Sequence, residues 1–356
     1  MGGGALYRCH RRAGSTRGLN ARLADARRRA PVAPGGCRGH VPDRCRPRPR
    51  RGAFDVGVVS GGAEELSWPE AALREAGLLL RLEIEDRRLV RIGHCAIFAL
   101  PSRRLVARIA RPDQGAECME AEMALARFLH RAGLPVVSPA DDVAERPIQT
   151  RRGVVTFWPL VASTGRKIDW PGLGRVLRRI HSLRPPDELL SLWDPLGRVE
   201  ARLEAYRSRP EARAEYVRLL SAACSWGRRT IDSSAPSVLV HGDPTNVIMT
   251  AGGVVLIDFD LCGLGPALWD VASVTVRHRR FGLSRSDLQG FYAGYRFDSA
   301  ASCGLKDLVR LRELLDSSFA LGAAPGGSSA VDHELEIRMG ALRDPTDRRR
   351  WTPLDP

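Results

Sequence analysis

The chain of 356 residues is long enough to bury one large hydrophobic core or two moderate ones, and its formal net charge is +14 at pH 7. Such a charge would ordinarily favour nucleic acid as a partner. However, residues 1–52 hold 14 arginines against only Asp25 and Asp43, so the rest of the chain is close to neutral. Nucleic acid is therefore not expected to be its partner. No apolar run approaches the roughly 18 residues of a membrane-spanning helix, so no membrane partner is expected either.

Residues 1–67 are expected to form a disordered arm, because the Arg-, Gly- and Pro-rich composition of residues 1–52 has no sustained apolar periodicity. An Arg-rich, acid-poor arm also describes an organellar transit peptide, but its Pro and Gly residues interrupt the amphipathic helix that such a peptide needs. The basic run at 44–51 could contact nucleic acid, but an unstructured tail or a start codon placed too far upstream is favoured. The eight cysteines form no CxxC pair and fit no zinc-binding spacing, which favours a reducing cytoplasm.

The ordered chain is expected to begin near Trp68 with a short helix at 69–77. Three strands then predict an antiparallel β meander: 78–85, 88–92 leading into 95–100, and 105–110. Further elements are expected in this order: a helix at 114–132, an extended segment at 134–137, and a strand at 154–161.

From Trp170 onward the pattern becomes helical, with apolar residues spaced at i, i+3 and i+4. Helices are expected at 173–182, 194–208, 213–233, 271–277, 286–295 and 306–321. His181 ends the first of them and is expected to interact with the helix terminus and not with a ligand. Residues 323–330 have the Gly, Pro and Ser content of a linker, and the tail to residue 356 is poorly patterned.

Polar side chains follow short apolar runs between residues 238 and 260. Asp243 comes directly after one run, Asn246 precedes the next, and Asp258 and Asp260 close the third. Each of these residues alone could simply cap a turn. Together they gather oxygen-bearing groups at neighbouring strand ends, which suits Mg2+, and a carboxylate there can accept a proton from a substrate hydroxyl. The pattern therefore favours a catalytic site.

This segment resembles the catalytic core of the aminoglycoside phosphotransferase and choline kinase family, the small-molecule branch of the protein-kinase-like fold. Its HGD sequence matches the family's catalytic loop, which implies that Asp243 orients or deprotonates the acceptor hydroxyl. Its IDFD sequence matches the metal-binding segment, which implies that Asp258, with Asn246 and Asp260, binds Mg2+. The family usually has four residues between the catalytic Asp and the Asn, whereas this chain has two. Asp270 resembles a family residue that braces the active-site loops.

The resemblance also implies a cation for the nucleotide phosphates in the β-rich lobe. Arg108 occupies the strand position where the family most often has Lys, and Arg keeps the positive charge. A helix Glu should pair with it, as in kinases. Glu122 is the expected partner, with Glu117 and Glu120 as competitors. On pattern alone, Arg108 could equally be an exposed residue on an alternating strand.

Three further residues are implied to contact ATP. Gly93 lies in a turn where its backbone could approach phosphate, although a lone Gly is also what a turn requires. Trp158 and Leu160 lie in the strand that leads to the hinge between the lobes and could line the adenine site. Ordinary core packing explains these two residues equally well.

These observations predict an α+β, two-lobed protein-kinase-like fold. The expected divisions are a disordered arm (1–67), a small nucleotide-binding lobe (68–158), a helical catalytic and substrate lobe (159–322), and a linker and tail (323–356). The implied activity is transfer of the γ-phosphoryl group of ATP to a small-molecule hydroxyl. The alternatives are a nucleotide-binding pseudokinase without turnover and a nucleic-acid-binding protein acting through the basic arm. An arginine surplus in 173–230 and 271–312 predicts an acceptor that is neutral or singly positive.

Overall fold

The computed structural model describes residues 67–93, 95–111, 115–189, 193–232, 237–298, 302–322 and 329–354. These residues belong to one of two units of the chain, Arg44–Pro356. The expected disordered arm and its basic run at 44–51 lie outside the described residues. None of the described helices is long and apolar enough to span a membrane.

The first described element is the helix α2, Ser67–Leu80, which is longer than the expected 69–77. The strand predicted at 78–85 is therefore wrong. Gly77 does not end the helix; Arg81 does, in the left-handed conformation with φ of 54°. The Leu82 amide donates to the Gly77 carbonyl at 2.8 Å, and the Arg81 amide to the Leu78 carbonyl at 3.3 Å. This is a Schellman-type end, which the residue types did not predict because Arg takes the position usually held by Gly.

The β-rich part is one five-stranded antiparallel sheet with the order β1-β2-β3-β5-β4. Its strands are β1 Arg88–Ile92, β2 Ala96–Leu100, β3 Leu105–Ala110, β4 Ile148–Gln149 and β5 Val154–Pro159. The turn before β3 is a 3-10 helix, η2 Pro101–Arg103. The predicted meander is confirmed from β1 to β3.

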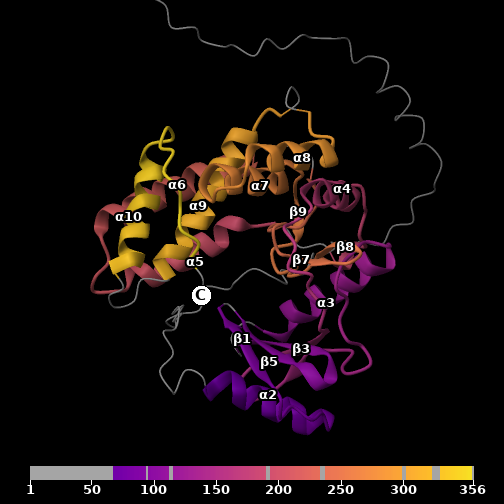
Figure 1. The fold of residues 1–356 in the computed structure, drawn as a ribbon. Coiled ribbons are helices and arrows are strands. Elements are labelled where there is room, and N and C mark those ends of the chain that lie inside the picture. The colour runs from indigo at the N-terminus through magenta and orange to yellow at the C-terminus, as the bar shows by residue number, and fades with distance from the viewer. Residues whose placement is uncertain are drawn as a thin grey trace, which may run out of the picture. The chain divides into compact units, whose positions relative to one another are not determined.

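Two helices cover the sheet on opposite sides (Figure 1). Alternating residues of β2, β3 and β5 pack against α2 in one apolar cluster, which includes Leu73, Phe98 and Phe157. The helix α3, Ala116–Arg131, lies on the other side, toward the helical part of the chain. Its buried residues Met123 and Leu129 join a cluster that also contains residues of that helical part. The segment at 134–137 is extended as expected, and Val136 forms a parallel bridge with Leu256.

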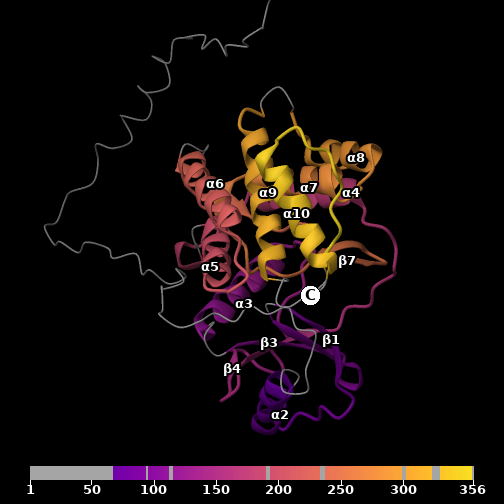
Figure 2. The same ribbon diagram turned by 90° about the vertical axis from the view of Figure 1, so that its left-hand side faces the viewer.

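The helical part contains seven α-helices among the described residues. They are α4 Trp170–His181, α5 Pro195–Arg207, α6 Ala214–Asp232, α7 Leu268–Arg280, α8 Arg285–Tyr295, α9 Leu305–Gly322 and α10 Ser329–Arg343. A short 3-10 helix, η4 Asp187–Leu189, lies before α5. Helices α5 and α6 lie beside α9 and α10 (Figure 2).

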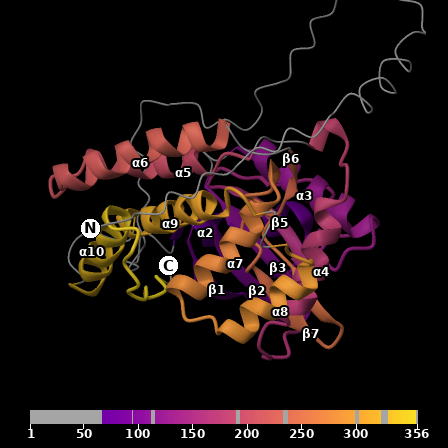
Figure 3. The ribbon, with the colours of Figure 1, turned by 90° about the horizontal axis from the view of Figure 1, so that it is seen from above.

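Helices α4 and α8 pack very closely (Figure 3) because glycines face the contact. A Cβ at Gly294 would lie 2.1 Å from the Pro171 carbonyl oxygen, and one at Gly174 would lie 2.5 Å from the Phe291 carbonyl oxygen. This contact lies near the N-terminal end of α4; at its C-terminal end, His181 Nδ1 lies 2.7 Å from the Tyr295 hydroxyl of α8.

Two small antiparallel pairs of strands lie between the sheet and the helices. β7 Val247–Thr250 pairs with β8 Gly253–Leu256, as the apolar runs predicted. β6 Ser237–Val240 pairs with β9 Gly263–Pro266. The sequence GLGP of β9 gives no strand signal, because Gly and Pro are depleted in strands.

The C-terminal tail forms ordered structure that its sequence pattern did not predict. Beyond α10, the Trp351 amide donates to the Arg280 carbonyl at 2.7 Å. The fully buried Arg280 pairs with Glu313 at 2.6 Å, and its guanidinium lies 4.9 Å from the Trp351 ring centroid. Arg338 of α10 donates to the Thr352 carbonyl at 2.6 Å. The tail thus covers a buried charge that joins α7 to α9.

Replacing Trp351 with Ala should therefore destabilise the fold by about 3–5 kcal/mol, the usual cost of removing a buried aromatic ring. Chemical denaturation measures this change. Thr352→Ala is the matched control, because Thr352 is exposed and its hydrogen bonds to Arg338 and Glu334 come from its backbone. Equal stability of the two variants would contradict a structural role for the tail.

Candidate active site

The loop that follows β6 is held by one buried carboxylate, that of Asp270 on α7. The two oxygens of Asp270 accept the backbone amides of His241 and Gly242, each at 2.9 Å. His181 also binds it, with Nε2 2.9 Å from Oδ2, and the other His181 nitrogen lies 2.7 Å from the Tyr295 hydroxyl. The end of α4 therefore braces the loop through Asp270, a contact not foreseen for His181.

Gly242 cannot be replaced without disturbing this loop. Its φ is +87°, and a Cβ would lie 2.2 Å from the Leu261 carbonyl oxygen. Its own carbonyl accepts hydrogen bonds from Trp269 Nε1 at 2.7 Å and Arg312 Nη1 at 3.0 Å. The neighbouring His241 ring is fully buried, 5.2 Å from the Phe259 ring between centroids, and burial lowers its pKa. Burial therefore favours the neutral form of this imidazole.

Asp243 emerges from this loop beside two arginines. Arg312 Nη2 of α9 lies 3.1 Å from its Oδ1, and the Thr245 hydroxyl donates to the same oxygen at 3.2 Å. Arg277 of α7 in turn donates to Thr245 at 3.0 Å. Burial favours the neutral acid, but the charges of Arg312 and Arg277 outweigh it and hold the pKa of Asp243 below its ordinary value. Asp243 is therefore ionised at neutral pH.

Asp258 lies after β8 in a strained backbone conformation, with φ of +67°. Its Oδ1 accepts from Arg108 Nη2 at 3.1 Å, and its Oδ2 accepts from Asn246 Nδ2 at 3.3 Å. Burial, together with the charge of Asp260, raises the pKa of Asp258 to about 6 despite the opposing charge of Arg108. The loop that is two residues shorter than expected still brings Asn246 to this carboxylate.

Arg108 of β3 joins Asp258 to Glu122 of α3. Its Nη1 donates to Glu122 Oε1, and the same oxygen accepts the Phe259 amide at 3.1 Å. Burial raises the pKa of Glu122, although the charge of Arg108 opposes that shift. The competing residues Glu117 and Glu120 are exposed. One guanidinium thus ties together a strand, a helix and the loop after β8.

Asp260 is held from a different direction. Arg198 of α5 donates through Nη2 to its carboxylate and to its carbonyl oxygen, both at 3.1 Å. Asp258 and Asp260 therefore have separate cationic partners, one in the sheet and one in the helical part.

Three further residues were expected to contact the nucleotide by packing or backbone. Gly93 is in the β1–β2 turn. The charge of Arg91, two residues earlier, opposes the rise in the pKa of Asp258. Trp158 is 7% exposed and belongs to the same apolar cluster as Phe259. The partly exposed Leu160 follows β5, and its amide donates to the Arg104 carbonyl at 2.7 Å.

The donor atoms near Asp258 can be compared with what a magnesium ion requires. Among the described residues, no group of three or more His, Cys, Asp or Glu side chains could hold a metal by itself. Asp258 and Asn246 offer one carboxylate and one amide oxygen, and Mg2+ typically takes one or two carboxylates and completes its shell with phosphate and water. The donor set therefore fits Mg2+ delivered with a nucleotide.

Comparison with known proteins finds a family model described as "Phosphotransferase enzyme family", which matches residues 97–308. No curated protein sequence matches the chain.

Three solved structures share the fold. One is amicoumacin kinase hAmiN in complex with AMP-PNP, Ca2+ and Ami, with a TM-score of 0.64 and 16% identity over 82% of this chain and 98% of that one. Another is a microcompartment-associated aminopropanol kinase, with a TM-score of 0.57 and 20% identity over 76% of this chain and 95% of that one. The third is an aminoglycoside-3'-phosphotransferase of type VIII, with a TM-score of 0.51 and 17% identity over 70% of this chain and 99% of that one. The predicted α+β, two-lobed kinase-like fold is confirmed.

If Asp270 holds the loop, Asp270→Asn should release it, because an amide cannot accept two backbone N–H groups and bind His181 equally well. Each weakened hydrogen bond to a charged group should cost about 1.5–3 kcal/mol. Amide hydrogen exchange should then accelerate at His241 and Gly242. The exposed Asp142 provides the control variant, Asp142→Asn. Unchanged exchange at both amides would contradict the bracing role.

Proposed function

Because the chain belongs to the phosphotransferase enzyme family, we propose that it transfers the γ-phosphoryl group of ATP to a hydroxyl group of a small molecule. The observation that carries this proposal is the pair of largely buried carboxylates with different charge environments. Asp258 is linked to Arg108 and Asn246, whereas Asp243 is linked to Arg312. Such a division suits a site in which Asp258 binds the metal beside the phosphate-binding Arg108, while Asp243 receives the acceptor hydroxyl.

The proposed nucleotide site consists of residues from both lobes. Arg108, oriented by Glu122, would neutralise phosphate charge, and Asp258 with Asn246 would hold Mg2+, with Asp260 beside them. The bound Mg2+ would neutralise charge on the phosphates. Gly93, Trp158 and Leu160 would lie along the nucleotide. The amicoumacin kinase structure was solved with AMP-PNP, which supports ATP as the donor.

Asp243 would orient the acceptor hydroxyl and receive its proton. Its lowered pKa makes it a weak base but keeps it charged, so its main contribution would be to position the hydroxyl and not to remove its proton early. Phosphoryl transfer asks little covalent chemistry of a protein, and positioning with electrostatic stabilisation supplies most of the rate.

We extend the proposal to the roles of the two lobes. Residues 68–158 would bind the nucleotide, and residues 159–322 would supply Asp243 and the acceptor site, with α10 and the tail supporting α7 and α9. A cytoplasmic location, where ATP and Mg2+ are available, suits this activity. A pseudokinase without turnover is disfavoured by the proximity of Asn246 to Asp258. Nothing in the described residues supports binding of nucleic acid in preference to a small molecule.

The Asp243→Asn variant tests the catalytic assignment. It should keep its affinity for ATP, because the Asp243 carboxylate is bonded to Arg312 and Thr245 and not to Arg108, and should lose about 10²–10⁴-fold in kcat. Coupled ADP release during a screen of hydroxylated small molecules measures turnover. Asp332→Asn, at an exposed position of α10, is the control. Near-normal turnover by Asp243→Asn would remove Asp243 from the mechanism.

The two aspartates of the IDFD segment should differ in their effect on nucleotide binding. Asp258→Ala should abolish the Mg2+-dependent part of ATP binding, because Asp258 is the carboxylate beside Arg108 and Asn246. Asp260→Ala should weaken it less, because Arg198 engages that carboxylate. Calorimetric titration of ATP with and without Mg2+ separates the cases. Equal loss would mean that both residues bind the metal, and equal tolerance would eliminate the metal site.

A further inference from the structure

Arg202 of α5 has no carboxylate partner among the described residues. Its Nη1 donates to the Ser318 hydroxyl of α9 at 2.9 Å, and its guanidinium lies over the Phe319 ring, 3.7 Å from the centroid. Ser318 is neutral, so this contact does not balance the charge. Arg202 as a whole is partly exposed, so its guanidinium is not sealed from solvent.

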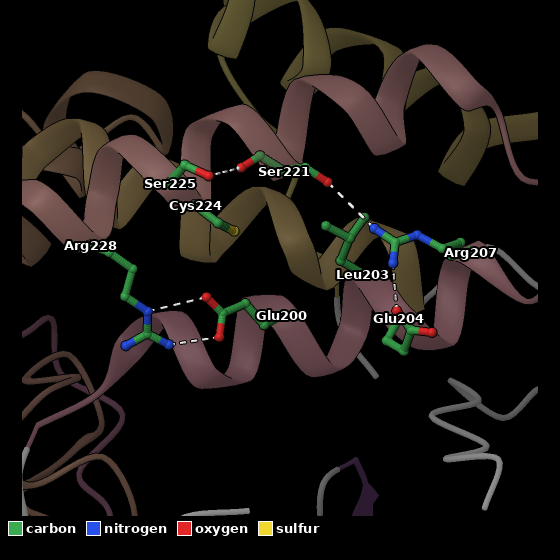
Figure 4. A pocket seen from close by; sticks show the side chains of 8 residues that line it. All are labelled: Glu200, Leu203, Glu204, Arg207, Ser221, Cys224, Ser225 and Arg228. Carbon is green, nitrogen blue, oxygen red and sulfur yellow. Dashed lines mark hydrogen bonds and ion pairs between the residues drawn. The ribbon is translucent and has the colours of Figure 1, made fainter. Parts of the chain in front are cut away.

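Three other arginines of α5 and α6 are paired with acids. Arg198 binds Asp260 at 3.1 Å, and Arg207 binds Glu204 at 2.8 Å. Arg228 of α6 binds both Glu200 and Asp194 at 2.7 Å. Figure 4 shows Arg207 and Arg228 at a cavity of about 290 Å³ between α5 and α6, each with its glutamate. Arg202 differs from these three arginines in having a neutral partner.

Arg202 lies near charged residues that adjoin Asp243, because the charges of Asp260 and Arg312 both act on it. It follows Arg198, which reaches the IDFD segment, by one helical turn of α5. Its partner Ser318 follows Arg312 by six residues on α9, about 9 Å along the helix axis, and Arg312 binds Asp243. The same two helices therefore hold Arg202 and position the catalytic segment.

The acids around Arg202 compensate its positive charge only in part. Burial and the charge of Arg198 lower its pKa to about 9 although the charges of Asp316 and Asp260 oppose that shift, so it is still mostly protonated at neutral pH. A cation with little exposure to water is costly unless an anion accompanies it. Phe319 beside it is 46% exposed, so an apolar ring face adjoins the guanidinium. A ligand with an anionic group and an adjacent apolar part would cover both.

We propose that Arg202 binds an oxyanion group of the acceptor, so that the substrate is a hydroxylated small molecule with a negative charge. A guanidinium fork matches the two oxygens of a carboxylate or a phosphate. This inference rests on the proposed phosphotransferase function and replaces the neutral or singly positive acceptor that the arginine surplus predicts. The acceptor hydroxyl would lie at Asp243 while its anionic group lies between α5 and α9.

The test compares acceptors that share a glycerol framework: glycerol, glycerate and glycerol phosphate, alongside the pair of glucitol and gluconate. The wild type should prefer the acidic members, and Arg202→Gln should lose about tenfold to a hundredfold of that preference in kcat/KM. Arg202→Lys should retain part of it by keeping the charge. Arg228→Gln should behave as the wild type. Glycerate and glycerol phosphate distinguish carboxylate from phosphate recognition.

A second measurement does not depend on turnover. Calorimetric titration with inorganic phosphate at constant ionic strength should detect a site that Arg202→Gln loses and Arg228→Gln keeps. Equal phosphate binding by the two variants, or a wild type that prefers neutral acceptors, would overturn the role of Arg202. Preserved Mg2+-dependent ATP binding and turnover of neutral acceptors would then leave the proposed function standing. Loss of both ATP binding and turnover in the wild type would instead contradict the proposed function itself.

Discussion

The cost of burying charge shapes this site. Two carboxylates, Asp243 and Asp258, lie in surroundings that favour their neutral form, and each is accompanied by an arginine from another element. Arg108 comes from the sheet and Arg312 from α9, so the site depends on elements far apart in the sequence meeting correctly. Removing one partner of a buried pair leaves an uncompensated charge and is strongly destabilising. The balance between burial and the arginine charges differs at the two aspartates. The arginines prevail at Asp243 and lower its pKa, whereas burial prevails at Asp258 and raises its pKa.

A second constraint keeps the catalytic loop in place. The loop after β6 needs a left-handed residue at Gly242, and its amides would be unsatisfied without the carboxylate of Asp270. Because α7 carries Asp270 and α4 carries His181, the tight glycine contact between α4 and α8 contributes to the same support. Contacts of α4 and α7 away from Asp243 thus support the loop from which Asp243 emerges. The shortened loop to Asn246 is compatible with this support, since the Asn246 amide still reaches Asp258.

The sequence predicted the fold class, the hairpin β7–β8 and the proximity of Asp243, Asn246 and Asp258, because short apolar runs ending in acids are visible locally. The family resemblance also favoured Glu122 as the partner of Arg108, with Glu117 and Glu120 left as competitors. The sequence could not identify Arg312, Arg277 or Arg198 as partners of the site, because each comes from a helix whose arginines look alike in sequence and differ only in what they face. The strand predicted at 78–85 failed for a local reason: Arg81 adopts the left-handed conformation usually reserved for Gly, so the apolar run continues α2. The order of the tail depends on Arg280 and Trp351 meeting, and spacing alone does not encode that contact.

The central claim is that this arrangement transfers phosphate and does not merely bind nucleotide. Mass spectrometry of a library of hydroxylated small molecules, incubated with the full chain, ATP and Mg2+, tests it most directly. The account predicts at least one acceptor that gains the mass of a single phosphoryl group while an equal amount of ADP forms. ATP that binds in the presence of Mg2+, with no phosphorylated product from any acceptor, would contradict the account and identify the protein as a nucleotide-binding member of its family without turnover.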